Sequence, residues 1–534
     1  MGFPNMANCS HFYRMRAIDK ARITGIPTQG VIMAFALCVI ACLMPYFYQV
    51  GEPYLVISVV ALLSCLTAYY RPVLLRSDLL LSGVLVYVMI VAFSHGSINS
   101  PITLWRWLAA GLAFYCGRLF INEPCIFAGV FIVPAFVQTI IVMLQQVGIL
   151  QSLSFFFPVS GTFGNPAQAA VLIALGFAAS LTIIKEKWTV LRHGGRITFI
   201  GLSSLFAIAL LFCNTRSCLL SSIAVSVYLF FGYWFSKKKM LFTLLTVILF
   251  AVGLYFLRTE SANVRLLIWQ ASWYLFEKHP VFGGGSTSFA AGYMLAQAIF
   301  FTKHPESPLV IFANEHNQPY NELIRLLCEQ GVVGTMLIIT LIILLAKKNG
   351  RLPLCMLSLL VIAFFYNVSD TLVLFLVFWM ILGQMGNGNC FFSKNKKDWT
   401  WRILGGITAI VSFFFLLNSD HMPSKKWEVE LLSYRSVCNE GDAFLSRGMH
   451  EYAEQRYQLA NAMIPCRITA PYKLFKLYES YEPDKAIRWG RHVLDDMTFP
   501  VVNGHMLQMK ADIRSGIDSL EHSLLITINS EKEL

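Results

Sequence analysis

Two arginines and one histidine lie where a mostly apolar chain turns briefly polar. Arg216 falls in the stretch FCNTRSCLL (212–220), between two apolar runs, and Arg265 falls in SANVRLLIWQASW (261–273). A guanidinium can grip a diphosphate with paired, charge-assisted hydrogen bonds. The imidazole of His316 could take a proton from a hydroxyl at neutral pH. In the alternative interpretation, Arg216 extends its charge from the membrane interface to water, and His316 is only a helix-capping or interface residue.

Carboxamide and glycine residues nearby are further candidates for substrate contact, namely Asn165, Gly284, Asn317 and Asn321. Asn165 precedes Pro166, and this pair can start a helix. Gly284 is the centre of a triple glycine, which predicts a flexible turn. We expect Gln318 or Asn317 to cap a helix that begins with Pro319 and continues through Gly331 into an apolar run.

The composition places the chain in the membrane. It has 534 residues, of which 56% are hydrophobic and 13% charged, and its mean hydropathy is +0.59. A soluble domain is about 45–50% apolar and about 25% charged. We therefore expect an all-α polytopic membrane protein.

A bilayer core needs about 20 mostly apolar residues per helix, because backbone polar groups in hydrocarbon must pair within their own segment. By this criterion we expect about 12–13 membrane helices. Their approximate ranges are 30–50, 53–70, 78–96, 102–120, 124–149, 167–185, 197–213, 217–236, 239–257, 331–347, 352–367, 370–387 and 402–418. The first run lacks a small-residue cleavage site and is expected to be an anchor.

The distribution of Lys and Arg predicts the orientation. Loops around 14–22, 185–196 and 237–239 are basic, whereas the alternate loops 95–101 and 366–370 have no Lys or Arg. Because basic loops stay in the cytoplasm, the N-terminus is predicted to be cytoplasmic. The formal net charge of +12 is then mainly a topology signal, and no nucleic acid is expected as a partner.

This topology predicts two domains. Residues 1–419 form the membrane domain, whose long polar interval 258–330 is expected to be a large outer loop. Within this loop, the apolar positions from Val264 onward predict a helix lying in the membrane interface. Residues 420–534 are expected to form an outer helical domain, in which Cys438 and Cys466 could form a disulfide in an oxidising compartment.

The tail carries a repeat-like pattern. Small and aromatic residues stand at offsets that resemble a tetratricopeptide repeat, at Gly441, Gly448, Ala453, Tyr457, Ala460 and Pro465. A weaker second unit follows, and small residues at these offsets let two antiparallel helices approach closely. A generic helical hairpin is the alternative. Such a surface could bind a protein partner or pack on the membrane domain.

Together these stretches resemble the O-antigen ligase and polymerase superfamily, the Wzy-C group of bacterial envelope proteins. The resemblance covers about residues 160–390 and is strongest from about 160 to 335. Its marks are GTFGNP (161–166), the TRS arginine Arg216, R-x-x-I-W from Arg265, HPVFGGG (279–285) and HN…GVVG (316–334). Their order along the chain, on one predicted face, carries the resemblance.

The resemblance implies a GT-C-like, metal-independent glycosyltransferase. Such an enzyme moves a glycan from undecaprenyl diphosphate to an acceptor hydroxyl at the periplasmic face of the bacterial inner membrane. Arg216 and Arg265 would hold and neutralise the diphosphate, and His316 would be the general base. No cofactor is expected, and the sequence has no carboxylate cluster or Cys/His spacing typical of a metal site.

One departure from the family pattern concerns the base. The usual spacing between the His-Asn pair and Gly-x-x-Gly fits from Asn321 to Gly331, which would put Tyr320 in the position of the histidine. His316 lies about one helical turn earlier. We assign the base to His316, with Tyr320 as its rival, because an ordinary tyrosine, with a pKa of about 10, is a poor base at neutral pH.

The resemblance leaves the acceptor open. Lipid A core, another glycan repeat, or a protein Ser or Thr are the candidates, so a polymerase and an O-linked protein oligosaccharyltransferase are alternatives to a ligase. A transporter or flippase is a further alternative, although the sequence lacks an evident repeated pattern of broken spans. The last alternative is a non-enzymatic assembly protein that binds a partner through its tail.

Overall fold

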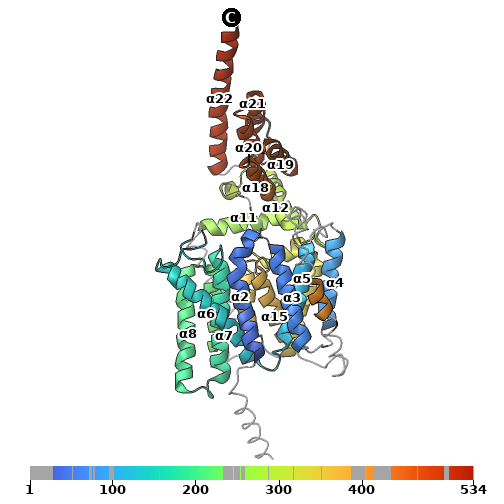
Figure 1. Cartoon of the computed structure of the whole chain (residues 1–534), viewed down its shortest axis with the longest axis vertical. Coiled ribbons are helices and arrows are strands. Elements are labelled where there is room, and N and C mark those ends of the chain that lie inside the picture. The colour runs from blue at the N-terminus through green and yellow to red at the C-terminus, as the bar shows by residue number, and fades with distance from the viewer. Residues whose placement is uncertain are drawn as a thin grey trace, which may run out of the picture.

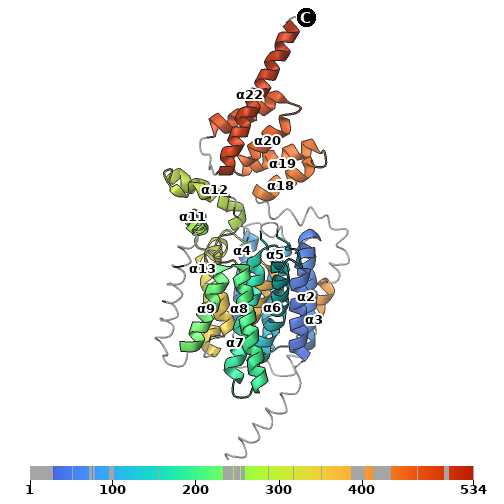
Figure 2. The same ribbon diagram turned by 90° about the vertical axis from the view of Figure 1, so that its left-hand side faces the viewer.

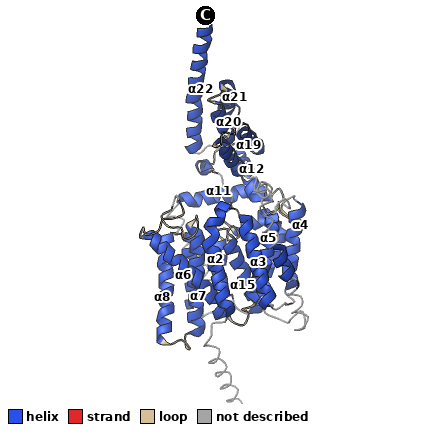
Figure 3. Ribbon diagram, in the orientation of Figure 1, coloured by secondary structure: helices blue, strands red, loops and turns tan. Residues whose placement is uncertain are grey.

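The computed structural model is built of helices. It describes chiefly residues 28–94, 101–231, 259–386, 405–412, 434–497 and 504–532, with short gaps inside these ranges. The described residues form α-helices with short 3-10 and π segments and no β-strand (Figure 3). The all-α prediction is therefore confirmed.

The membrane part is a bundle of roughly parallel and antiparallel helices (Figure 1). Its described helices are α2 (Thr28–Val50), α3 (Glu52–Tyr70), α4 (Asp78–Ser94), α5 (Pro101–Arg118), α6 (Pro124–Gln146), α7 (Pro166–Lys187), α8 (His193–Cys213), α9 (Arg216–Phe231), α13 (Glu322–Asn349), α14 (Leu354–Ala363) and α15 (Leu372–Gln384). Each coincides with an apolar run expected from the sequence. The run 239–257 lies almost wholly outside the described residues, and the described part of 402–418 is helical.

Several of these helices are long and apolar enough to cross a membrane. Among the described residues, four meet this criterion of length and composition: Pro124–Gln146, Pro166–Lys187, His193–Cys213 and Glu322–Lys347. Shorter apolar helices of the bundle accompany them. The chain is therefore a multi-pass membrane protein.

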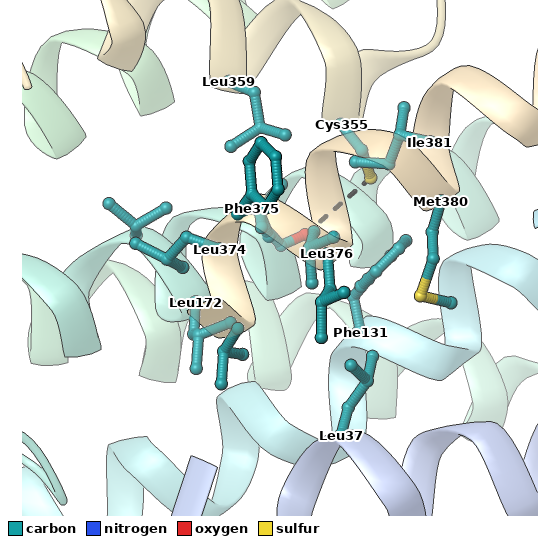
Figure 4. Packing of buried hydrophobic residues seen from close by; sticks show 14 of the residues in the cluster. Leu37, Phe131, Leu172, Cys355, Leu359, Leu374, Phe375, Leu376, Met380 and Ile381 are labelled. Atoms are coloured by element: carbon teal, nitrogen blue, oxygen red, sulfur yellow. Dashed lines mark hydrogen bonds between the residues drawn. The ribbon is translucent and has the colours of Figure 1, made fainter. Parts of the chain in front are cut away.

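Helix α15 forms the centre of the bundle. Its side chains Leu374, Phe375, Leu376, Met380 and Ile381 are buried among those of α2, α6, α7 and α14 (Figure 4). Gly117 of α5 and Gly383 of α15 allow these two helices to touch, because a Cβ on either would overlap a backbone carbonyl of the other helix. This close-packed centre gives the outer ends of the helices a rigid support.

The large loop and the tail lie at the same end of the bundle (Figures 1 and 2). The loop contributes α11 (Thr259–Phe276), which lies across that end, then α12 (Ser288–Lys303) and the 3-10 helix η2 (Pro308–Phe312). The tail consists of α18 (Tyr434–Leu445), α19 (His450–Met463), α20 (Thr469–Tyr478), α21 (Pro483–Arg491), the π segment η5 (His492–Asp496) and α22 (Gly504–Lys532).

In the tail, α18 and α19 approach closely at Gly441, where a Cβ would meet the ring of Tyr457 at 2.3 Å. This is the close approach expected from the small residues of the repeat-like pattern. The assignment to tetratricopeptide repeats and the boundary at 419/420 remain predictions. Cys466 lies outside the described residues, so its disulfide with Cys438 stays a prediction.

Candidate functional site

Arg216 begins α9, Arg265 lies on α11, which crosses the end of the bundle (Figure 1), and the charges of the two side chains interact. Asn214 ends α8 in the left-handed conformation, with φ of 51°, and α9 starts two residues later at Arg216. Arg265 is in the second turn of α11 and is partly buried. Burial, and next the positive charge of Arg216, lower the pKa of Arg265. The two guanidiniums are thus close enough to repel, and an anion between them would relieve that repulsion.

Tyr320 and His316 lie beside Arg265. The guanidinium of Arg265 stands over the ring of Tyr320, 5.9 Å from its centroid. The rings of Tyr320 and His316 meet edge to face with centroids 6.0 Å apart. The indole N–H of Trp269, one turn after Arg265, donates to the carbonyl of Pro319 at 3.0 Å. Helix α11 therefore holds the segment that carries both candidate bases.

The start of α13 differs from the prediction. The helix begins at Glu322 and not at Pro319, and its cap is Asn321, whose Oδ1 accepts from the backbone N–H groups of Leu323 and Ile324 at 2.9 and 3.2 Å. Tyr320 has a φ of 51°, which a helix cannot contain. This left-handed conformation costs about 1–2 kcal/mol for a residue with a side chain. Asn321 is 3% exposed, so its carboxamide serves the helix end.

The triple glycine packs against the kink of α13. Gly331 interrupts that helix with φ of 64° and ψ of −172°. The N–H groups of Gly284 and Gly285 donate to the carbonyls of Cys328 and Glu329 at 2.9 and 3.0 Å. Those of Val332 and Val333 donate back to the carbonyls of Pro280 and Val281, at 2.9 and 3.1 Å. These four bonds join the segments 280–285 and 328–333, which we call the glycine clasp.

The clasp explains why glycines recur in both segments. A Cβ on Gly331 would lie 2.3 Å from the carbonyl oxygen of Val281, and one on Gly283 would lie 2.4 Å from Glu329. The hydroxyl of Tyr87, on α4, donates to the carbonyl of Gln330 at 2.6 Å. The clasp thus fixes the C-terminal end of α11 to the membrane bundle. Gly284, a candidate for substrate contact, is one of its donors.

A partly buried polar cluster adjoins the start of α13, and it was not predicted from the sequence. Arg325 donates to Glu329 at 3.2 Å and to the hydroxyl of Ser369 at 2.7 Å, and that hydroxyl also bonds Glu322. Arg106 of α5 donates to the carbonyl of Ser369 at 2.8 Å. The signal that could have predicted this cluster is the presence of charged residues beside apolar runs. The cluster ties the turn between α14 and α15 to the start of α13.

Asn165 caps α7, as its sequence predicted. Its Oδ1 accepts from the N–H of Ala167 at 2.9 Å, and Asn165 itself is exposed. Two glutamines of α6 hold the preceding turn: Gln145 accepts from the N–H groups of Ser160 and Gly161, and Gln138 accepts from that of Thr162. The turn is therefore fixed by buried carboxamides inside the bundle.

Two other predictions concern Asn317 and the absence of a metal. Asn317 lies outside the described residues. Within the described ranges, no group of three or more His, Cys, Asp or Glu could hold a metal ion. The structure thus brings together Arg216, Arg265, His316, Tyr320 and Asn321, and it links Gly284 to them through the clasp.

The fold and site define a multi-pass, all-α membrane protein with a cationic site at one end of its bundle. Residues 201–339 match a family model, Wzy_C, described as O-antigen ligase. This segment runs from α8 into α13 and includes both arginines, His316 and the whole clasp. This segment is therefore similar to the domain of the O-antigen ligase superfamily, and the match supports that superfamily. A comparison with curated proteins returns no match to the chain.

Proposed function

We propose that this protein transfers a glycan from a polyprenyl diphosphate, of the undecaprenyl type, to an acceptor hydroxyl at the periplasmic face of the bacterial inner membrane. The acceptor oxygen attacks the anomeric carbon of the glycan and gives its proton to the base. The bond between that carbon and the diphosphate oxygen breaks, and the diphosphate leaves with the electron pair. The reaction needs no oxidant and no nucleotide.

Arg216 and Arg265, whose positive charges interact, carry this proposal. Two guanidiniums that repel one another form a site that is stabilised by an anion with more than one negative charge. Among the described residues, no Asp or Glu forms an ion pair with Arg265, so a bound ligand would supply the countercharge. A diphosphate gains charge as its bond to the glycan breaks, and the pair stabilises this change.

The neighbouring segment 316–320 supplies the base. His316 takes the proton from the acceptor, and Tyr320 stands between its ring and Arg265. A base and an anion site within one small region suit a displacement reaction, because the nucleophile and the leaving group are both partly bonded to the same carbon in the transition state. The aromatic ring of Tyr320 also offers a face on which a sugar can stack.

The acceptor is proposed to be the lipid A core, as for an O-antigen ligase. A polysaccharide polymerase or an O-linked protein oligosaccharyltransferase would use the same arginines and base with another acceptor. Helices α11 and α12 and the tail all lie at the end of the bundle that carries the site, which supports an acceptor arriving from that side (Figure 2).

The test is glycan transfer in membranes with wild type, Arg216→Ala, Arg265→Ala or Arg265→Lys at matched protein level. Lipopolysaccharide and periplasmic proteins are both probed, so that the labelled product identifies the acceptor. Each alanine variant is expected to lower transfer by about 10²-fold and to accumulate the lipid-linked glycan. Arg265→Lys is expected to recover only part of the rate, because a lysine lacks the planar fork.

Arg491→Ala is the matched control. Arg491 is an exposed arginine of the tail that pairs with Glu521, so its loss is expected to leave transfer unchanged. Full transfer by both Arg216→Ala and Arg265→Ala would contradict the proposed function and favour a transporter or an assembly protein.

A further inference from the structure

The first helices of the tail share a hydrophobic core with the large loop. Buried residues of the loop and α13 pack in one cluster with buried residues of α18, α19 and α20. The loop side includes Leu267, Ile268, Tyr293 and Phe300, and the tail side includes Tyr434, Val437, Ala460 and Ile464. The tail is therefore packed against the helices that form the site.

Arg467 extends from the tail into this cluster. It lies between α19 and α20 and is 2% exposed. Its Nη1 donates to Oε1 of Gln297, on α12, at 3.4 Å, and its Nη2 contacts the sulfur of Met294 at 3.6 Å. Burying a guanidinium is costly unless its N–H groups find acceptors. The burial of Arg467 can be explained by the side chain that it orients, which is Gln297.

Arg467 determines which way the carboxamide of Gln297 points. An arginine can only donate, so the oxygen of Gln297 must face it and the NH2 group must face the opposite way. Nε2 of Gln297 then donates to the hydroxyl of Tyr293 at 3.0 Å and to the carbonyl of Asn314 at 3.2 Å. Both Gln297 and Tyr293 are fully buried, so water does not offer alternative partners.

Both acceptors of Gln297 flank His316. Asn314 is two residues before it, and the ring of Tyr293 meets the imidazole edge to face with centroids 6.1 Å apart. We propose that Arg467 is a positioning residue that holds His316 in place through Gln297, so that the tail completes the site of the transferase. The catalytic part of this inference rests on the proposed function. The positioning of His316 rests only on the contacts of Arg467 and Gln297.

Charge at Tyr293 agrees with this arrangement. Burial raises the pKa of Tyr293, while its bond from Gln297 and the positive charge of Arg467 lower it. The hydroxyl therefore stays protonated at neutral pH, and its oxygen accepts a hydrogen bond from Gln297. Arg467 itself is buried from solvent, which fits a positioning role better than a substrate contact.

The informative variants are Gln297→Glu and Arg467→Met in the full-length protein. A carboxylate at 297 still accepts from Arg467, and even pairs with it, so the tail stays packed. It can no longer donate to Asn314, so the segment before His316 is released. If Arg467 acted only by keeping the tail packed, Gln297→Glu would preserve that packing and leave transfer unchanged. Arg491→Met makes the same change as Arg467→Met on the exposed face of the tail.

Two measurements decide the question. In the transfer assay, Gln297→Glu and Arg467→Met are expected to lower kcat by about 10²-fold, the cost of a misplaced catalytic group. KM for the lipid-linked donor is expected to stay within a factor of about 3, because the arginines that bind it are untouched. Hydrogen exchange is also measured on the peptide spanning 313–321 and is expected to be faster in both variants than in wild type or Arg491→Met.

The outcomes separate this inference from the proposed function. An unchanged kcat in Gln297→Glu, or unchanged exchange of 313–321 in Arg467→Met, would overturn the positioning role. If wild type transferred no glycan, the proposed function would fall, yet the exchange of 313–321 would still decide whether Arg467 holds this segment.

Discussion

At the scale of single residues, the site places both candidate bases side by side. His316 and Tyr320 are not on successive turns of one helix, because Tyr320 adopts a φ of 51° before α13 begins. Their rings are 6.0 Å apart, and the ring of Tyr320 contacts Arg265. The two residues therefore need not be alternatives. The histidine can take the proton while the tyrosine ring keeps Arg265 and His316 in place.

We predict that His316→Ala lowers transfer by about 10²–10⁴-fold, the usual contribution of a general base. Tyr320→Phe is expected to stay within a few fold of wild type, because it keeps the ring that contacts Arg265. Single-turnover transfer in membranes at matched protein level measures both. Loss of activity in Tyr320→Phe, together with an active His316→Ala, would instead assign the base to Tyr320.

At the scale of elements, the glycine clasp joins α11 to the kink of α13. Its four backbone bonds require close contact between two segments, and Gly331 and Gly283 make room for it. Arg265 and Trp269 are on α11, while Asn321 caps α13. The clasp therefore sets the distance between Arg265, part of the proposed anion site, and the segment that carries the candidate bases.

We predict that Gly331→Ala destabilises the protein and lowers transfer. Its φ of 64° and ψ of −172° lie in a region that is almost exclusive to glycine and costs other residues about 1–3 kcal/mol. The new Cβ would also overlap the carbonyl of Val281. Thermal unfolding of the solubilised protein and transfer in membranes are the measurements.

Gly201→Ala is the control for this substitution. Gly201 lies within α8, and a Cβ there would meet no atom within 4 Å. Alanine is expected to be neutral or slightly stabilising at that position, because it favours a helix more than glycine does. A Gly331→Ala variant as stable and active as Gly201→Ala would refute the role assigned to the clasp.

At the scale of the whole molecule, the loop helices and the tail share one end of the bundle (Figures 1 and 2). The alternate loops at the other end are predicted to be the basic ones, such as 185–196. Because basic loops remain in the cytoplasm, we predict that the tail and the site face the periplasm. The glycan donor and its acceptor would then meet outside.

Alkaline phosphatase fusions test this orientation, because that enzyme becomes active only in the periplasm. A fusion after Leu534 is expected to be active. A fusion after Lys187, between α7 and α8, is expected to be inactive and serves as the internal control. The reverse pattern would place the site in the cytoplasm and rule out a periplasmic transfer.

The sequence by itself determined the membrane helices and some of their ends. Backbone groups in lipid must pair within each segment, so apolar runs of sufficient length have few alternatives to a helix. Asn165 before Pro166 likewise determined the start of α7, because a cap acts on the next turn only. Arg216 and Arg265 could be chosen as candidate site residues from the local sequence alone. A charged side chain next to lipid is costly, so an arginine beside an apolar run indicates a functional role.

Only the tertiary structure decided what those residues meet. The clasp joins backbone groups about 50 residues apart, and glycine composition alone predicted only a flexible turn. Arg467 reaches Gln297 across 170 positions of the chain, a contact that no local pattern encodes. Helix formation depends on neighbours in sequence, whereas close approach and the orientation of a buried carboxamide depend on how distant helices pack.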